Sequence, residues 1–198
     1  LHARILQSRV FSKPVVNSEY GYHLRDRDGD GTPDKDNSTS LRSIRHATWD
    51  IVMAGGYVVT GFGTTYFGGN RDPGPFHLES DKNVAWQQQI GAMKRLFSDL
   101  QWWNLAPHNE LIQCQTPRGR DGEELGRTAP PDVTYWCLAE PGKQYVVYAR
   151  GLVVPVAMSL QGAVGEWQIQ QFDPRSGRFD KIDAAIDNGR FEYRPPDD

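Results

Sequence analysis

The chain has 198 residues, of which 38% are hydrophobic and 24% are charged, and its formal net charge is −3. That much apolar material excludes wholesale disorder, and the length suits one domain or two small ones. No stretch approaches the roughly 18 apolar residues of a membrane span, and the slightly acidic charge predicts no nucleic-acid partner.

Residues 1–105 alternate strand-like and helix-like segments. A short extended run at 14–18 comes first, and apolar residues at helical spacing within 40–55 then predict a helix that a Gly-Gly pair ends. The β-branched and aromatic run at 57–62 predicts a second buried strand, and the pattern over 81–100 predicts a longer helix. This order of strand, helix, strand and helix is typical of parallel α/β folds.

The remaining residues, 106–198, read as an all-β domain. Short apolar or aromatic runs are separated by Gly, Pro, Asp and Ser turns, a spacing that predicts an antiparallel β-sandwich. The strands are expected at 111–114, 133–137, 145–149, 153–157, 167–172 and 191–193.

Two adjacent tryptophans, Trp102 and Trp103, lie in the connection between these two parts. At a domain boundary such a pair more often packs one domain on the other than binds a ligand. We therefore expect packing, with ligand binding as the alternative.

Residues 26–37 form an acidic loop with the spacing of a calcium site. Carboxylates at loop positions 1, 3, 5 and 9, a glycine at 6 and a carbonyl at 7 converge on a hard cation. The loop resembles the aspartate-rich calcium repeats of thrombospondin type 3 and dockerin segments, and its alternative is a solvated acidic turn. A structural calcium ion would indicate a secreted or periplasmic protein. The expected ligands are Asp26, Asp28, Asp30, Thr32, Asp34 and Asn37, the last standing where an EF-hand has Glu.

Glu19 stands at the end of the first predicted strand, where α/β barrels place their chemistry. A carboxylate among aromatic side chains suits glycoside hydrolysis, although a lone Glu at a strand end is equally often a structural hydrogen-bond acceptor. Tyr20 is one of the neighbouring aromatic residues, and its ring is a further candidate to stack on or hydrogen-bond a sugar. The predicted substrate-binding residues, which follow the two strands, are Tyr22, His23, Phe62 and Tyr66.

Several motifs, taken in order, resemble the apiosidase-like glycoside hydrolases. They are the strand 13–22 (KPVVNSEYGY), the helix and strand within 41–63, the segment 103–107, and the β-domain runs 145–148 and 167–177. In that family the last runs belong to a β-domain named for collagen binding. The similarity covers most of the chain.

The resemblance implies a fold class of α/β plus all-β, namely the C-terminal β/α units of a (β/α)8 barrel followed by the β-sandwich. The other barrel strands would lie upstream in the same protein or on another chain, so this chain alone would be incomplete and inactive. The resemblance also implies that Glu19 is the nucleophile of a secreted, retaining glycoside hydrolase acting on a poly- or oligosaccharide. The acid/base carboxylate would come from a missing strand.

The sequence departs from the family at His23, which often is Glu there, and at the calcium loop, which looks like an insertion. Both leave the sugar specificity open. The alternative function is a non-catalytic, calcium-stabilised protein that binds carbohydrate or matrix.

Cys114 and Cys137 are the only cysteines, and both fall at strand-like positions. Secretion would allow them to pair, whereas two cysteines in a β-core can equally be free and buried. The sequence leaves both possibilities open.

Overall fold

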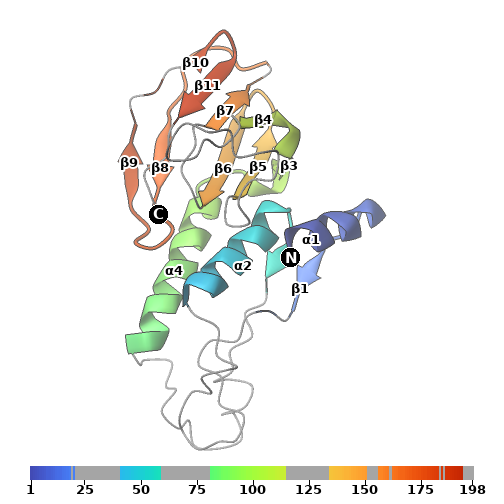
Figure 1. Cartoon of the computed structure of the whole chain (residues 1–198), viewed down its shortest axis with the longest axis vertical. Coiled ribbons are helices and arrows are strands. Elements are labelled where there is room, and N and C mark those ends of the chain that lie inside the picture. Colours follow the sequence, from blue (N-terminus) through green and yellow to red (C-terminus); the bar gives the residue numbers. More distant parts are fainter. Residues whose placement is uncertain are drawn as a thin grey trace, which may run out of the picture. The chain divides into compact units, whose positions relative to one another are not determined.

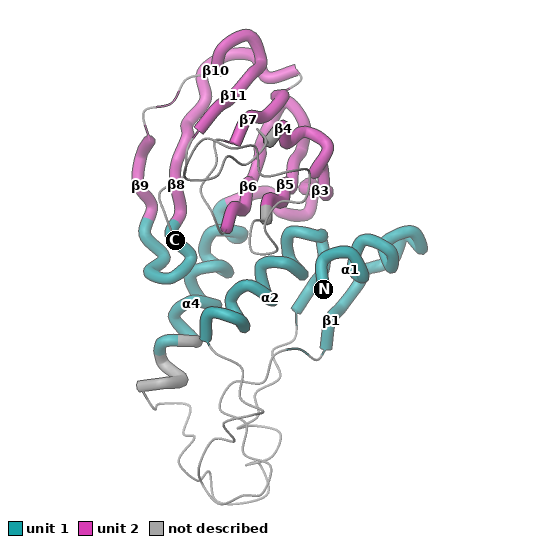
Figure 2. The backbone as a smooth tube through the Cα atoms, viewed as in Figure 1, with its two compact units in different colours: residues 1–99, 173–178 teal, residues 100–172, 179–198 magenta. Residues whose placement is uncertain are grey.

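A computed structural model of the chain describes residues 1–18, 20, 41–58, 81–114, 134–150, 156–160, 162–182, 184 and 186–193. The chain divides into two compact units (Figure 2). The first unit is residues 1–99 with 173–178, and the second is residues 100–172 with 179–198.

The first unit is built from helices and one short sheet. Its elements are α1 (His2–Ser8), the 3-10 helix η1 (Arg9–Phe11), β1 (Val16–Asn17), α2 (Leu41–Met53), β2 (Tyr57–Val58) and α4 (Asp81–Ser98). Both predicted helices are confirmed, and each predicted strand is present as a two-residue strand. Helix α1 was not predicted.

Strands β1 and β2 pair in parallel, with Val16 opposite Tyr57 and Asn17 opposite Val58. Helix α2 lies between them in the chain and ends as the glycine pair predicts. Gly55 has a φ of +72°, and the Gly56 N–H donates to the Ile51 carbonyl at 3.0 Å. A glycine in the left-handed region together with this bond is the Schellman ending, which satisfies the last helix carbonyls.

The core of the first unit forms around one face of α2. Ile44 and Ile51 lie seven residues apart, hence on the same helix face, and both are buried. They pack with Ile5 of α1, with Tyr20 and with Ala54. Burial of this apolar face is the main term that holds α1, α2 and the short sheet together.

The described residues of the second unit form strands and 3-10 turns. Its elements are η2 (Trp102–Asn104), β3 (Ala106–Pro107), η3 (Asn109–Leu111), β4 (Ile112–Cys114), β5 (Thr134–Glu140), β6 (Gln144–Arg150), β7 (Val156–Ser159), β8 (Gln170–Phe172), β9 (Phe179–Lys181), β10 (Ile186–Asp187) and β11 (Arg190–Tyr193) (Figure 1). They form antiparallel sheets with the orders β10-β11-β7-β4, β3-β5-β6 and β8-β9.

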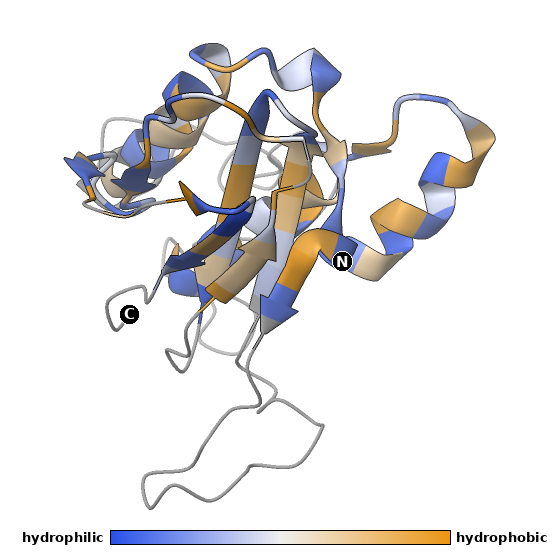
Figure 3. Ribbon diagram, turned by 90° about the horizontal axis from the view of Figure 1, so that it is seen from above, coloured by the Kyte–Doolittle hydropathy of each residue, from blue (hydrophilic) through white to orange (hydrophobic). Residues whose placement is uncertain are grey.

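Side chains from two of these sheets meet in one core. Cys137 and Ala139 alternate along β5, and Val156 and Met158 alternate along β7, so each pair lies on one face of its sheet. All four are buried and belong to the same cluster. Figure 3 shows hydrophobic stretches, in orange, along several of the strands.

The predicted fold class is wrong. The described ranges form mostly small antiparallel sheets with three α-helices, which is mainly-β, and no units of a (β/α)8 barrel are evident there. Sequence periodicity predicts the local order of strand and helix. A barrel additionally requires each strand to pair along both edges, and within the described residues β1 and β2 pair only with each other.

Candidate functional site

The predicted site residues lie outside the part of the chain that the structure describes. This holds for Glu19, for the predicted sugar contacts Tyr22, His23, Phe62 and Tyr66, and for the calcium ligands Asp26, Asp28, Asp30, Thr32, Asp34 and Asn37. Their roles therefore stay predictions. The described residues next to them are the ends of strands β1 and β2, after which the segments with these predicted residues begin.

The ends of the two parallel strands lie next to the predicted site residues in the sequence. Asn17 is the last residue of β1, Val58 is the last described residue of β2, and these two residues are register partners. Because the strands are parallel, the chain leaves both of them at the same edge of the sheet. Glu19 follows Asn17 by two positions, and in open α/β sheets ligands bind beyond this edge.

Tyr20 is fixed to α2 rather than available to a ligand. Its ring is 6% exposed, and its hydroxyl lies 2.8 Å from the Thr48 Oγ1. The single hydroxyl hydrogen of Thr48 goes to the Ile44 carbonyl at 2.8 Å, so Tyr20 must be the donor to Thr48. Burial raises the pKa of Tyr20, and the bond to Thr48 partly opposes that rise.

This anchor corrects the interpretation of Tyr20 as a neighbouring sugar contact. The chain is held on both sides of Glu19, by the β1 pairing before it and by Tyr20 directly after it. Sequence reasoning did not find the anchor. Its only signal was Thr48, which lies four residues after Ile44 on the apolar face of α2.

Asn17 adds an unsatisfied group at the same edge. Its Oδ1 is buried and has no hydrogen-bond partner among the described residues. A buried amide carbonyl without a partner costs free energy, so native proteins supply a donor to such atoms. Asn17 can therefore accept a hydrogen bond from a donor that the described residues do not provide.

The second unit brings together another group of polar residues, around η3. The His108 Nδ1 lies 2.6 Å from the Glu110 Oε1, and this hydrogen bond lowers the pKa of the Glu110 carboxyl. The neighbouring Asn109 Oδ1 accepts a bond from the Cys137 N–H at 2.8 Å. The Asn109 bond fastens η3 to β5, whereas the His108–Glu110 contact joins residues two positions apart and Glu110 is largely exposed.

A small cavity lies between α2 and α4, lined mainly by Ile44, Thr48, Trp49 and Met93. Its volume of ≈ 10 Å³ has room for about one water molecule. It is therefore too small to hold a substrate.

Comparison with protein-family models finds no matching family. Comparison with curated protein sequences finds no significant match either.

No helix in the described ranges is long and apolar enough to cross a membrane. Within the same ranges, no three His, Cys, Asp or Glu side chains gather to hold a metal ion, and the predicted calcium loop falls outside them.

Calcium is expected to raise the melting temperature if the acidic loop is a calcium site. At a free concentration one hundred times the dissociation constant, mass action stabilises the folded state by about 2.7 kcal/mol, or about 5–10 °C for a chain this size. Thermal unfolding in millimolar calcium, in chelator and in equal magnesium would measure this shift. A melting temperature independent of calcium would leave the loop as a solvated acidic turn.

Cys137 is a free, buried thiol in β5. It lies opposite Val147 of β6, whereas Cys114 lies opposite Val156 of β7, so the two cysteines belong to different sheets. Burial, with a smaller contribution from the Glu110 charge, raises the pKa of Cys137 to about 12.

Cys137 is expected to resist thiol reagents in the native protein and to react once the protein unfolds. At pH 8 a thiol with this pKa stays protonated, and the thiolate is the reactive form. Alkylation followed by mass mapping, with and without denaturant, would measure the difference. A Cys137 that becomes alkylated only after reduction would instead show that it is paired with Cys114.

Proposed function

We propose that this chain is part of a secreted or periplasmic glycoside hydrolase that cleaves a poly- or oligosaccharide with retention of configuration. The observation that carries the proposal is the parallel pairing of β1 and β2. In the sequence Glu19 follows β1, and the predicted aromatic sugar contacts follow β1 and β2, so both segments begin next to register partners of one sheet. A carboxylate beside aromatic residues at such an edge suits attack on a sugar.

In this proposal Glu19 is the nucleophile. Its carboxylate attacks the anomeric carbon and forms a covalent glycosyl-enzyme, while a second carboxylic acid protonates the departing oxygen. Water then attacks the same carbon, the second group takes its proton, and Glu19 leaves. The anchoring of Tyr20 to Thr48 supports this role, because a nucleophile needs a backbone that is held in place.

The second carboxylate is proposed to come from further polypeptide, upstream in the same protein or on another chain. The supporting observation is that one face of the parallel pair is exposed, since Val16 and its register partner Tyr57 are 55% and 42% exposed. Parallel sheets are almost always covered on both faces. Polypeptide that covers this pair would lie close enough to the strand ends to contribute the acid/base group.

Hydrolysis by the full-length protein tests the proposal. Soluble plant and microbial glycans and aryl glycosides would be screened for reducing-sugar release, and proton NMR would record the first anomer formed. We expect release of a sugar with the configuration of the substrate. First formation of the opposite anomer would exclude a nucleophilic Glu19.

The non-catalytic alternative gives a different result in the same screen. A protein that only binds carbohydrate or matrix would retain glycans without releasing sugar. Measurable binding without hydrolysis of any glycan in the panel would contradict the proposed hydrolase function and support this second function.

A further inference from the structure

The tryptophan pair at the start of the second unit is exposed. Trp102 is 41% exposed and Trp103 is 66% exposed. Their rings lie edge to face, with centroids 6.0 Å apart and an interplanar angle of 79°. Exposed large aromatic rings cost solvation free energy and are enriched where proteins bind ligands.

The pair is held on a fixed turn. The Asn104 N–H donates to the Gln101 carbonyl at 2.9 Å, and the Leu105 N–H donates to the Trp102 carbonyl at 3.1 Å. Leu105 is buried, and the following strand β3 pairs with β5. The backbone that carries the two rings is therefore ordered before any ligand arrives, which reduces the entropy cost of binding.

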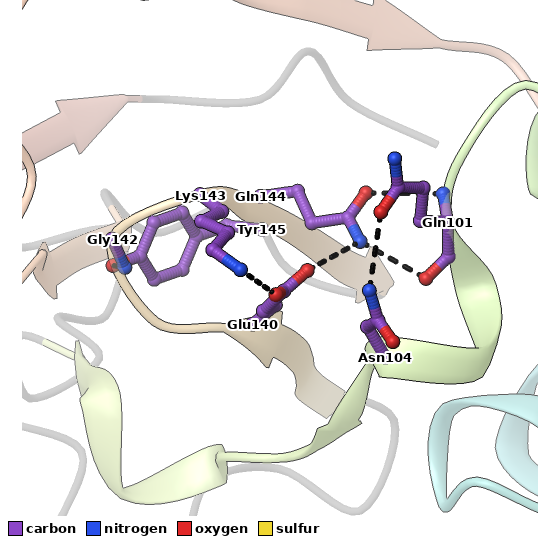
Figure 4. Close-up of polar contacts among 7 residues, drawn as sticks. All are labelled: Gln101, Asn104, Glu140, Gly142, Lys143, Gln144 and Tyr145. Carbon is purple, nitrogen blue, oxygen red and sulfur yellow. Dashed lines mark hydrogen bonds and ion pairs between the residues drawn. The ribbon is translucent and has the colours of Figure 1, made fainter.

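A cluster of amide and carboxylate groups flanks the same turn (Figure 4). The Gln144 Nε2 donates to the Gln101 carbonyl at 3.0 Å and to the Glu140 Oε2 at 3.2 Å. The Asn104 Nδ2 donates to the Gln101 Oε1 at 3.1 Å, and the Lys143 Nζ donates to the Glu140 Oε1 at 2.5 Å. These contacts hold the polar groups in place, and amide hydrogens and carboxylate oxygens still have capacity for further bonds.

We propose that Trp102 and Trp103, together with Gln101, Asn104 and Gln144, form a carbohydrate-binding surface on the second unit. Its residues belong to the second unit, whereas Glu19 belongs to the first. A sugar presents apolar C–H faces that stack on aromatic rings and hydroxyls that bond to amides and carboxylates. Both kinds of group come from the turn 101–104 and from Gln144, whose side chain is bonded to that turn. The inference rests on the proposed action on glycans and adds a second place where the glycan is held.

The chemistry of the cluster favours a sugar over a lipid surface. Binding to an anionic membrane requires several unpaired cations beside the aromatic rings. The only cation of this cluster is Lys143, and it is bonded to Glu140. A neutral ligand rich in hydroxyl groups is the better match.

Affinity electrophoresis of the full-length protein in gels that contain xylan, pectin, β-glucan or glycol chitin tests the inference. We expect at least one polysaccharide to retard the wild type, and Trp103→Ala and Trp102→Ala to weaken that binding by about tenfold or more. Trp103→Phe should recover part of the binding because it keeps a ring. The matched control is Phe11→Ala, since Phe11 is 75% exposed but belongs to the first unit.

Two outcomes would overturn the inference. One is unchanged retardation of the Trp102→Ala/Trp103→Ala double variant whose circular dichroism and melting temperature match the wild type. The other is wild-type protein that no polysaccharide retards and whose sedimentation changes with these substitutions, which would indicate a protein partner.

A glycan-binding assay on the catalytic variant separates this inference from the proposed function. Glu19→Gln should be retarded like the wild type. If the protein hydrolyses glycans normally and Trp103→Ala binds them as well as the wild type does, only the proposed second binding surface is contradicted. If glycan binding is lost in Trp103→Ala and the wild type hydrolyses no glycan, only the proposed hydrolase function is contradicted.

Discussion

Replacement of Glu19 by glutamine is expected to reduce glycoside hydrolysis by the full-length protein by about 10³-fold or more, because an amide cannot form the glycosyl-enzyme. Glutamine keeps the size of the side chain, so the fold and the calcium response should be unchanged. Initial rates on an aryl glycoside and thermal unfolding would measure both effects. Glu166→Gln is the matched control, because Glu166 is an exposed residue of the second unit.

A second variant distinguishes a nucleophile from a carboxylate that only supports the site. In Glu19→Gly, added azide should restore cleavage of an activated aryl glycoside. Azide would take the empty position, attack the anomeric carbon and release the phenolate, yielding a glycosyl azide of inverted configuration. Full activity of Glu19→Gln, or the absence of any azide product from the glycine variant, would remove Glu19 from the proposed mechanism.

Gly56→Ala is expected to destabilise the first unit by about 3 kcal/mol, the upper range for overpacking. A Cβ at this position would lie 2.8 Å from the Ile5 Cγ2, 3.0 Å from the Ile51 Cγ2 and 3.1 Å from the Ile51 carbonyl oxygen. The first two groups belong to the core around α2. The third is the backbone acceptor of the bond that ends the helix, so it cannot move without loss of that bond.

Gly91→Ala is the matched control, and the opposite sign is expected for it. Gly91 lies inside α4, and the nearest atom to its added Cβ is the Arg95 Nη1 at 3.7 Å, an ordinary contact. Alanine at such a position should stabilise the helix by about 1 kcal/mol. Urea unfolding of both variants would measure the two shifts. Equal shifts, or stabilisation by Gly56→Ala, would contradict the close packing of Gly56 against α1.

Much of the local structure could be predicted from the sequence. Helix α2 follows from apolar residues at helical spacing, and its end follows from Gly55, which adopts a left-handed conformation at no steric cost. Helix α4 and the strands at 111–114 and 145–149 follow from periodicity in the same way. In each case the determining interactions lie within one turn or one pair of neighbouring positions.

The candidate site could be predicted only in part. The order of strand and helix predicts Glu19 at the end of the first strand; the parallel pairing of β1 and β2 is observed, and Glu19 itself lies outside the described residues. The structural role of Tyr20 was missed, because the sequence pattern of an aromatic residue beside a carboxylate is the same whether the ring faces a sugar or the core. Only its bond to Thr48, 28 positions away, distinguishes the two.

Sequence by itself determined helices α2 and α4, the approximate positions of several strands and where α2 ends, because these depend on neighbours in the chain. Tertiary structure decided how the strands combine, and among the described residues they form small antiparallel sheets and one two-stranded parallel pair, with no barrel units evident. It also decided which aromatic residues face solvent, burying Tyr20 and exposing Trp103. Strand pairing and burial depend on contacts between residues far apart in the chain, and these contacts cannot be predicted from local periodicity.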